Sequence, residues 1–246
     1  MIKTRKKRYI IALAVVAALL AAFLAYTADY YRADAEAEAA LASDAAVQVS
    51  RTGYGWLFDG PSDDSALIFY PGAKVEETAY APLLHGIAAE GMDVCLVKMP
   101  FHLAIFGLNK ATDVMDRYAY GNWYIGGHSL GGAMAAEYAA SHGDRLDGVI
   151  LLAAYPTKAL DSGLLEVSIY GSEDEVLNME KVFAARSCAP PAYAEYEIEG
   201  GNHAQFGSYG AQRGDGAAAI SADEQRRRTT QLIMEEISGT SAEAGE

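Results

Sequence analysis

A G-x-S-x-G segment, Gly127-His128-Ser129-Leu130-Gly131, is the part of this chain with the clearest capacity for chemistry. An apolar run at 123–125 precedes it, and an alanine-rich stretch with helical spacing follows it. A serine on a sharp turn between a strand and a helix has its hydroxyl raised above the sheet, where a base can reach it. The flanking glycines suit such a turn because it is crowded. This context favours a nucleophilic serine over the alternative, a surface serine in a glycine-rich turn.

The base that a serine nucleophile requires should be a histidine further along the chain. His203 follows the last predicted strand directly, in Gly200-Gly201-Asn202-His203. The remaining histidines lie within the serine turn, in or at the end of predicted helices, or before the serine: His85, His102, His128 and His142. Position and order therefore favour His203 as the base over a surface histidine.

The acid that orients the base should follow the strand before the last one. Three carboxylates, Glu173, Asp174 and Glu175, come directly after the predicted strand at 165–170. Asp174 lies three residues past Gly171, after a tight turn, and is therefore our choice. The two glutamates are read as solvated charges or as acids at a helix N-terminus, where the helix dipole favours them.

An oxyanion hole needs two backbone N–H groups directed at the developing negative charge. Leu130, the residue after the nucleophile, should supply one of them from its helix N-terminus. Ala73 should supply the other from the loop Tyr70-Pro71-Gly72-Ala73-Lys74, which follows an earlier predicted strand. Candidate substrate contacts are Lys74, Phe101, His128 and Phe206, although a solvated lysine and core packing of the apolar stretch 99–106 explain some of them equally well.

The elements that must position these groups alternate between strands and helices from about residue 53. Predicted strands cover 54–58, 66–70, 94–98, 122–125, 148–153, 165–170 and 193–198, and predicted helices cover 76–89, 129–141 and 221–237. Such alternation predicts an α/β fold, with a mostly parallel sheet and helices on both faces. Catalytic groups should then meet where the carboxyl ends of the strands lie side by side.

The N-terminus differs in character from the rest of the chain. Basic residues crowd the first eight positions, and residues 9–26 carry no charge. Eighteen helical residues span about 27 Å, close to the thickness of a bilayer core. We expect a basic cytoplasmic flank at 1–8, a transmembrane anchor at 9–26, a stalk at 27–48 and an extracytoplasmic domain at 49–246. The alternative is a cleaved signal peptide and a secreted enzyme, with small-x-small sequences at 33–35 and 35–37.

Composition excludes some classes of function. The net charge is −14, and the part beyond the basic flank is more acidic still, so it would repel nucleic acid. No Cys/His spacing indicates a metal site, and we predict neither a metal nor another cofactor. The two cysteines, Cys95 and Cys188, could pair outside the cytoplasm, but sequence leaves their pairing and the oligomeric state open.

Taken together and in order, four segments resemble an α/β-hydrolase. They are 69–73, 126–132, 170–174 and 201–203, and the resemblance extends over about residues 50–240. More narrowly, they are similar to the small bacterial hydrolases related to dienelactone hydrolase. This likeness implies Ser129 as nucleophile, Asp174 as acid, His203 as base, and Ala73 and Leu130 as oxyanion donors. The nucleophile here is serine rather than cysteine, so the substrate of dienelactone hydrolase is not implied.

The short segment at 153–165 leaves no room for the lid domain that many relatives carry, so an open site is expected. The leading functional hypothesis is a membrane-anchored serine hydrolase that cleaves a small-molecule or lipid acyl ester, thioester or amide. One alternative is a hydrolase of lipid or cell-envelope substrates. The other is a non-catalytic binding module on a hydrolase scaffold.

Overall fold

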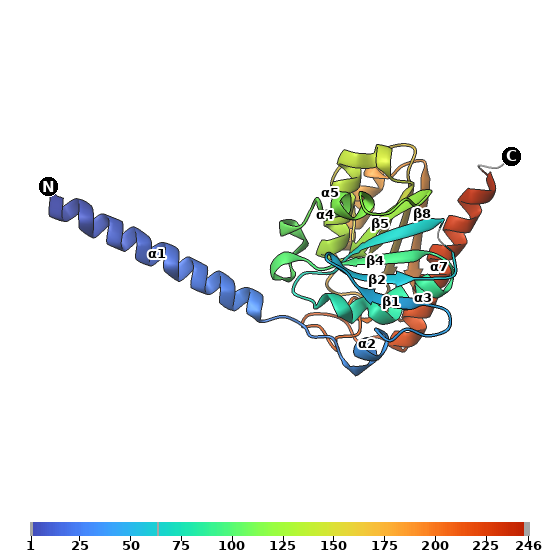
Figure 1. The fold of residues 1–246 in the computed structure, drawn as a ribbon, viewed down its shortest axis with the longest axis horizontal. Coiled ribbons are helices and arrows are strands. Elements are labelled where there is room, and N and C mark those ends of the chain that lie inside the picture. Colours follow the sequence, from blue (N-terminus) through green and yellow to red (C-terminus); the bar gives the residue numbers. More distant parts are fainter. Residues whose placement is uncertain (1, 63, 244–246) are drawn as a thin grey trace. The chain divides into compact units, whose positions relative to one another are not determined.

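The computed structural model describes residues 2–62 and 64–243, which fall into two units. The first unit, Met1–Tyr30, contains the single helix α1 (Ile2–Ala28) (Figure 1). Within it, Tyr9–Ala28 has a mean hydropathy of 2.6, enough by length and composition for either a membrane span or a signal sequence. The outer ends of the predicted flank and of the predicted domain, positions 1 and 244–246, lie outside the described residues.

The second unit is built on an eight-stranded sheet, and this confirms the predicted fold class. The strands are β1 (Gln48–Arg51), β2 (Gly55–Asp59), β3 (Ser65–Tyr70), β4 (Asp93–Val97), β5 (Asn122–His128), β6 (Gly148–Leu152), β7 (Leu165–Gly171) and β8 (Ala192–Ile198). Their order is β1-β2-β4-β3-β5-β6-β7-β8. Strands β3 to β8 are mutually parallel, and β2 is antiparallel to both of its neighbours.

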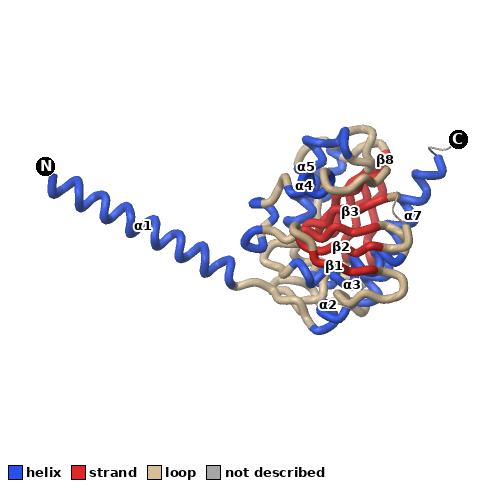
Figure 2. The backbone as a smooth tube through the Cα atoms, in the orientation of Figure 1, coloured by secondary structure: helices blue, strands red, loops and turns tan. Residues whose placement is uncertain are grey.

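Helices cover both faces of this sheet (Figures 1 and 2). Helices α3 (Ala81–Ala89) and α7 (Ala222–Glu243) pack together on one face, and α4 (Lys110–Met115) and α5 (Leu130–His142) cover the other. Helix α6 (Met179–Ala185) lies between β7 and β8 in the chain. Ser221 caps α7 by accepting the N–H of Glu224 at 3.1 Å, as its position before the helix predicts.

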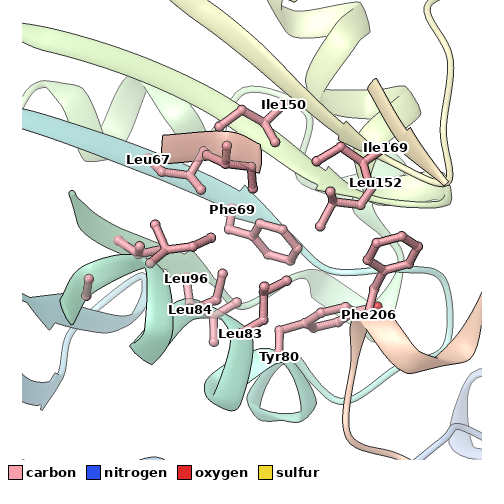
Figure 3. Close-up of a cluster of buried hydrophobic side chains, with 14 of the residues drawn as sticks. Leu67, Phe69, Tyr80, Leu83, Leu84, Leu96, Ile150, Leu152, Ile169 and Phe206 are labelled. Carbon is pink, nitrogen blue, oxygen red and sulfur yellow. The ribbon is translucent and has the colours of Figure 1, made fainter. Parts of the chain in front are cut away.

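Two hydrophobic cores result from this arrangement, one on each face. Alternate residues of β3 point to opposite sides: Leu67 and Phe69 enter the core under α3 and α7, whereas Ala66, Ile68 and Tyr70 enter the core under α5. Figure 3 shows the first of these cores. Two of its members, Tyr80 and Phe206, belong to loops that follow β3 and β8, so this core also fixes loops at the carboxyl edge of the sheet.

The segment that the sequence suggests as a stalk, 27–48, is instead largely part of the folded body, which begins at Tyr31. Tyr31 forms a parallel bridge with Val75, and Asp34 caps the short helix α2 (Ala35–Ala39). Glu36 pairs with the buried Arg226 of α7 at 2.5 Å. The prediction of a stalk is wrong because an alanine-rich, acidic segment has no apolar stripe that would indicate packing. Its carboxylates are instead held by specific partners in the folded body.

Glu166 of β7 gives the stability of the protein a distinct pH dependence. Burial, and secondly the nearby Glu195, raise the pKa of Glu166 from 4.5 to about 7. Between these values the unfolded carboxyl loses its proton while the folded one keeps it, so stability falls as pH rises and the loss is complete above about pH 7. Glu166→Gln should remove this loss.

The difference in unfolding free energy between the Gln variant and the unmodified chain should change by on the order of 3 kcal/mol, in favour of the variant, as the pH rises from about 4 to about 8. Chemical unfolding of the full chain in nonionic detergent measures it. Glu197→Gln, at an exposed position of the neighbouring strand, is the matched control. If the unfolding free energy depended on pH identically with and without the Glu166 substitution, Glu166 would not be the source of this pH dependence.

Candidate active site

Ser129 lies on a strained turn between β5 and α5. Its backbone angles are φ 54° and ψ −124°, a left-handed conformation that a residue with a side chain rarely adopts. Its N–H donates to Leu152 O at 2.9 Å, and this bond ties the turn to the end of β6. The serine is half-buried, so its hydroxyl remains accessible. The turn has the strand-turn-helix context that the G-x-S-x-G pattern predicts.

The carboxyl edge of the sheet concentrates backbone strain. Among the residues that the structure describes, five non-glycine residues have positive φ, and each follows one of the strands β3 to β6: Lys74, Phe101, His102, Ser129 and Ala153. Strain of this kind costs on the order of 1–3 kcal/mol per residue and persists where the surrounding structure enforces it. Its confinement to this edge marks the edge as the candidate site.

Close packing around the turn explains its glycines. A Cβ at Gly131 would lie 2.2 Å from Tyr70 O and 2.4 Å from Pro71 O, and one at Gly127 would lie 2.4 Å from Tyr70 O. The backbone after β3 therefore touches the serine turn directly. This contact brings the loop that contains Ala73 alongside Ser129.

Asp174 and His203 meet as the sequence suggests, from the ends of β7 and β8. Nδ1 of His203 lies 2.8 Å from Oδ2 of Asp174, and both side chains are almost completely buried. The other oxygen of Asp174 accepts the backbone N–H groups of Val176 at 2.9 Å and Leu177 at 2.8 Å. A carboxylate accepts only, so in the neutral imidazole Nδ1 carries the hydrogen and Nε2 carries the lone pair.

Nε2 of His203 is the atom that should receive the serine proton. It is buried and makes no hydrogen bond with any group among residues 2–62 and 64–243, Ser129 Oγ included. The ring of His128, the residue before the serine, lies 4.5 Å from the ring of His203. The ring of His203 therefore lies close to the serine turn, and hydrogen bonds between a nucleophile and its base are often long before a substrate binds.

Asp215 supports the histidine loop and was not indicated by the sequence. Its two carboxylate oxygens accept the N–H of His203 at 3.2 Å and that of Ala204 at 2.8 Å. On the other side, Gln225 of α7 exchanges two hydrogen bonds with the backbone of Asn202. An acid in a loop well beyond the last strand has no local pattern that would reveal this role.

Tyr80 and His128 support the loop after β3. The hydroxyl of Tyr80 accepts the N–H of Gly72 at 3.0 Å and lies 2.8 Å from Nδ1 of His128, to which it can donate its own hydrogen. Burial, and then the neighbouring His203, hold the pKa of His128 well below 6.5. A neutral His128 adds no like charge beside His203 when that ring takes up a proton.

The backbone N–H groups of Ala73 and Leu130 stay the predicted oxyanion donors, and the structure describes their surroundings. The N–H groups on either side of Ala73 are already engaged, because Gly72 donates to Tyr80 and Lys74 donates to His102 O at 2.8 Å. Leu130 is the first residue of α5, where backbone N–H groups have no partner within the helix. Gly72 and Lys74 are thus less suitable as donors than Ala73, and Leu130 is the first helical N–H after the serine.

The structure corrects two of the predicted substrate contacts. His128 is 1% exposed and Phe206 is 0% exposed, because both side chains fill the core beneath the site. Their rings lie 5.6 Å apart, so they act as packing partners rather than as a surface for a ligand. Lys74 and Phe101 do lie at the carboxyl edge, half-buried and 48% exposed respectively.

Other kinds of site find little support in the described part of the chain. No group of three or more His, Cys, Asp or Glu side chains there could hold a metal ion. Cys95 is buried on β4 and Cys188 follows α6, and both thiols are free. The arrangement of Ser129, Asp174 and His203 is therefore the candidate site with the most specific geometry.

Comparison with known proteins relates this chain to one family. The model described as the alpha/beta hydrolase family matches residues 66–227. Est1E from Butyrivibrio proteoclasticus has a similar structure, with a TM-score of 0.55 and 14% identity over 79% of this chain and 100% of its own. Carboxyl esterase 2 from the fungus Tuber melanosporum also has a TM-score of 0.55, with 9% identity over 83% of this chain and 91% of its own.

A third similar structure is an alpha/beta hydrolase enzyme from the sediment metagenome of the Mar Chica lagoon in Morocco. Its TM-score is 0.58, with 12% identity over 79% of this chain and 99% of its own. No curated protein matches the sequence. At these identities the similar structures support the fold.

Proposed function

Because this chain belongs to the alpha/beta hydrolase family, we propose that it is a serine hydrolase that transfers an acyl group to water through Ser129. The hydrogen bond of 2.8 Å between Asp174 and His203 is the observation that carries the proposal. This bond leaves the lone pair on Nε2, on the side of the ring away from Asp174, and the ring lies 4.5 Å from that of His128, the residue before the serine. Such a lone pair is what a serine hydroxyl needs to become a nucleophile.

The reaction would proceed in two halves. Ser129 Oγ attacks the carbonyl carbon while its proton passes to Nε2 of His203, and the carbonyl oxygen becomes an oxyanion facing the N–H groups of Ala73 and Leu130. Collapse of this intermediate breaks the bond to the leaving group, which takes the proton from His203. Water then repeats the sequence on the acyl-serine, and its proton returns through His203 to Ser129 Oγ.

Asp174 stabilises the imidazolium that forms in each half. The substrate is an ester, thioester or amide, and an acyl ester is our first choice. The similarity in fold to a carboxyl esterase supports this choice, although one fold carries many activities. The segment 153–164 between β6 and β7 is too short for a lid domain, so the site would be open to substrates of varied length.

We also propose that α1 remains attached and anchors the protein, with the folded body outside the cytoplasm. The basic residues before the apolar stretch and the acidic residues after it support this orientation. A cleaved signal sequence is the alternative, since the same helix is compatible with either role.

A fluorophosphonate probe tests both proposals on the full-length protein. The probe should label the folded chain covalently, and Ser129→Ala should abolish the label. The labelled band should sediment with membranes and stay there through a high-salt wash. Absence of labelling, or labelling that survives the alanine substitution, would reject the serine mechanism and favour a binding module; recovery of the intact chain in the wash would reject the anchor.

A further inference from the structure

An exposed apolar loop, residues 101–106, lies at the same edge of the sheet as Ser129, because it follows the carboxyl end of β4. Phe101, Ile105 and Phe106 are 48%, 58% and 53% exposed, and the two phenylalanine rings meet edge to face at 5.8 Å. Five large apolar side chains are strongly exposed in the described part of Tyr31–Glu246, and three of them belong to this loop. Clustered exposure of this kind marks a binding surface.

The backbone joins this loop to the start of the folded body. His102 O accepts the N–H of Lys74 at 2.8 Å, and Lys74 O accepts the N–H of Tyr31 at 2.7 Å. Tyr31 O in turn accepts the N–H of Glu76 at 2.8 Å. The loop, the turn that contains Ala73 and Lys74, and the first residue of the body therefore form one connected patch at the carboxyl edge.

The apolar helix ends immediately before this patch in the chain. The span of suitable hydropathy ends at Ala28, so Asp29 and Tyr30 alone separate it from Tyr31. A connection of this length extends at most about 10 Å. If α1 crosses a bilayer, this limit keeps Tyr31 near the lipid surface, whatever the orientation of the helix.

We propose that the apolar loop 101–106 inserts into the lipid surface and that the site takes acyl substrates that partition into the bilayer. The choice of substrate class rests on the proposed serine hydrolase function and on the proposed anchor. The net charge of −14 would oppose adsorption to anionic lipid, so the attachment is apolar and should not weaken as salt rises.

Depth-dependent fluorescence quenching tests the insertion without reference to catalysis. Full-length Phe106→Trp protein is reconstituted in phosphatidylcholine vesicles that contain lipids brominated on the acyl chain. Phe183→Trp is the matched control, since Phe183 is 52% exposed and lies on α6. Both variants retain Trp56 and Trp123, so the difference between them reports on the new tryptophan.

Residue 106 should be quenched more strongly than residue 183, at low and at high salt alike. Equal quenching at the two positions, or a difference that high salt abolishes, would overturn the insertion. This readout remains valid even if Ser129 proves not to be a nucleophile.

Activity then tests the substrate class. Ile105→Ser combined with Phe106→Ser should lower kcat/KM about tenfold for a long-chain nitrophenyl ester dispersed in the same vesicles. The same variant should hydrolyse a short, water-soluble nitrophenyl ester at the unmodified rate. An equal loss on both esters, or no loss on the vesicle-bound one, would overturn the proposal. Failure of the unmodified protein on both esters would instead count against the hydrolase function.

Discussion

Replacing Asp174 by asparagine should lower kcat about 10⁴-fold while the protein stays folded. The asparagine oxygen can continue to accept the N–H groups of Val176 and Leu177, so the loop keeps its shape. The amide nitrogen would then face Nδ1 of His203, where the carboxylate oxygen now lies at 2.8 Å. An amide N–H donates, so it forces Nδ1 to accept and moves the imidazole hydrogen to Nε2. A protonated Nε2 cannot take the proton of Ser129.

Steady-state kinetics with a soluble ester measures this loss. The neighbouring acids provide controls of the same charge, because Glu173 and Glu175 are exposed and neither bonds to His203. Glu173→Gln and Glu175→Gln should change kcat by less than about threefold. A large loss of kcat in either glutamine variant, together with a small loss in Asp174→Asn, would show that another residue is the acid.

Replacing Gly131 by alanine should destabilise the protein by at least about 3 kcal/mol and lower the activity of the remaining folded protein about 100-fold or more. The new Cβ would lie 2.2 Å from Tyr70 O and 2.4 Å from Pro71 O, and both of these are backbone atoms that cannot rotate away. Helix α5 and the end of β3 must therefore separate. Ser129 and the loop that contains Ala73 would move apart with them.

Chemical unfolding and kinetics on the same preparation measure the two effects. Gly239→Ala is the matched control, since a Cβ at this exposed position of α7 meets no atom within 4 Å. The control should gain about 0.5–1 kcal/mol through helix propensity and keep its activity. Equal stability of the two variants would refute the close approach of β3 to the serine turn.

Sequence patterns correctly placed the three candidates after strands and brought Asp174 and His203 together, because strand order determines which strand ends are neighbours. Ser129, Asp174 and His203 each follow a parallel strand, and parallel strands present their carboxyl ends at one edge. The support that other residues give to the site could not be predicted in this way, because it does not depend on their place at the end of a strand. Tyr80, His128 and Asp215 act through the folded core or through the backbone of another loop, and such contacts leave no local pattern.

Most strands of the sheet were predicted from their runs of apolar residues. Two of the elements that were missed lack a clear apolar pattern. Strand β1 is a short edge strand with mostly exposed side chains, and α6 is a helix of seven residues. The largest error concerns the segment before β1. Its order comes from Asp34, Glu36 and their partners Ser208 and Arg226, which are distant in sequence.

This N-terminal segment also restricts how the protein could be processed. Both small-x-small sequences, 33–35 and 35–37, lie within it, where Asp34 caps α2 and Ala37 is fully buried. A peptidase acting on the folded chain at either sequence would have to pull α2 away from Ser208 and Arg226 first. A cut just before Tyr31 would leave every one of these contacts in place. If α1 is the anchor that we propose, release of the folded body with these contacts intact requires cleavage between Ala28 and Tyr31.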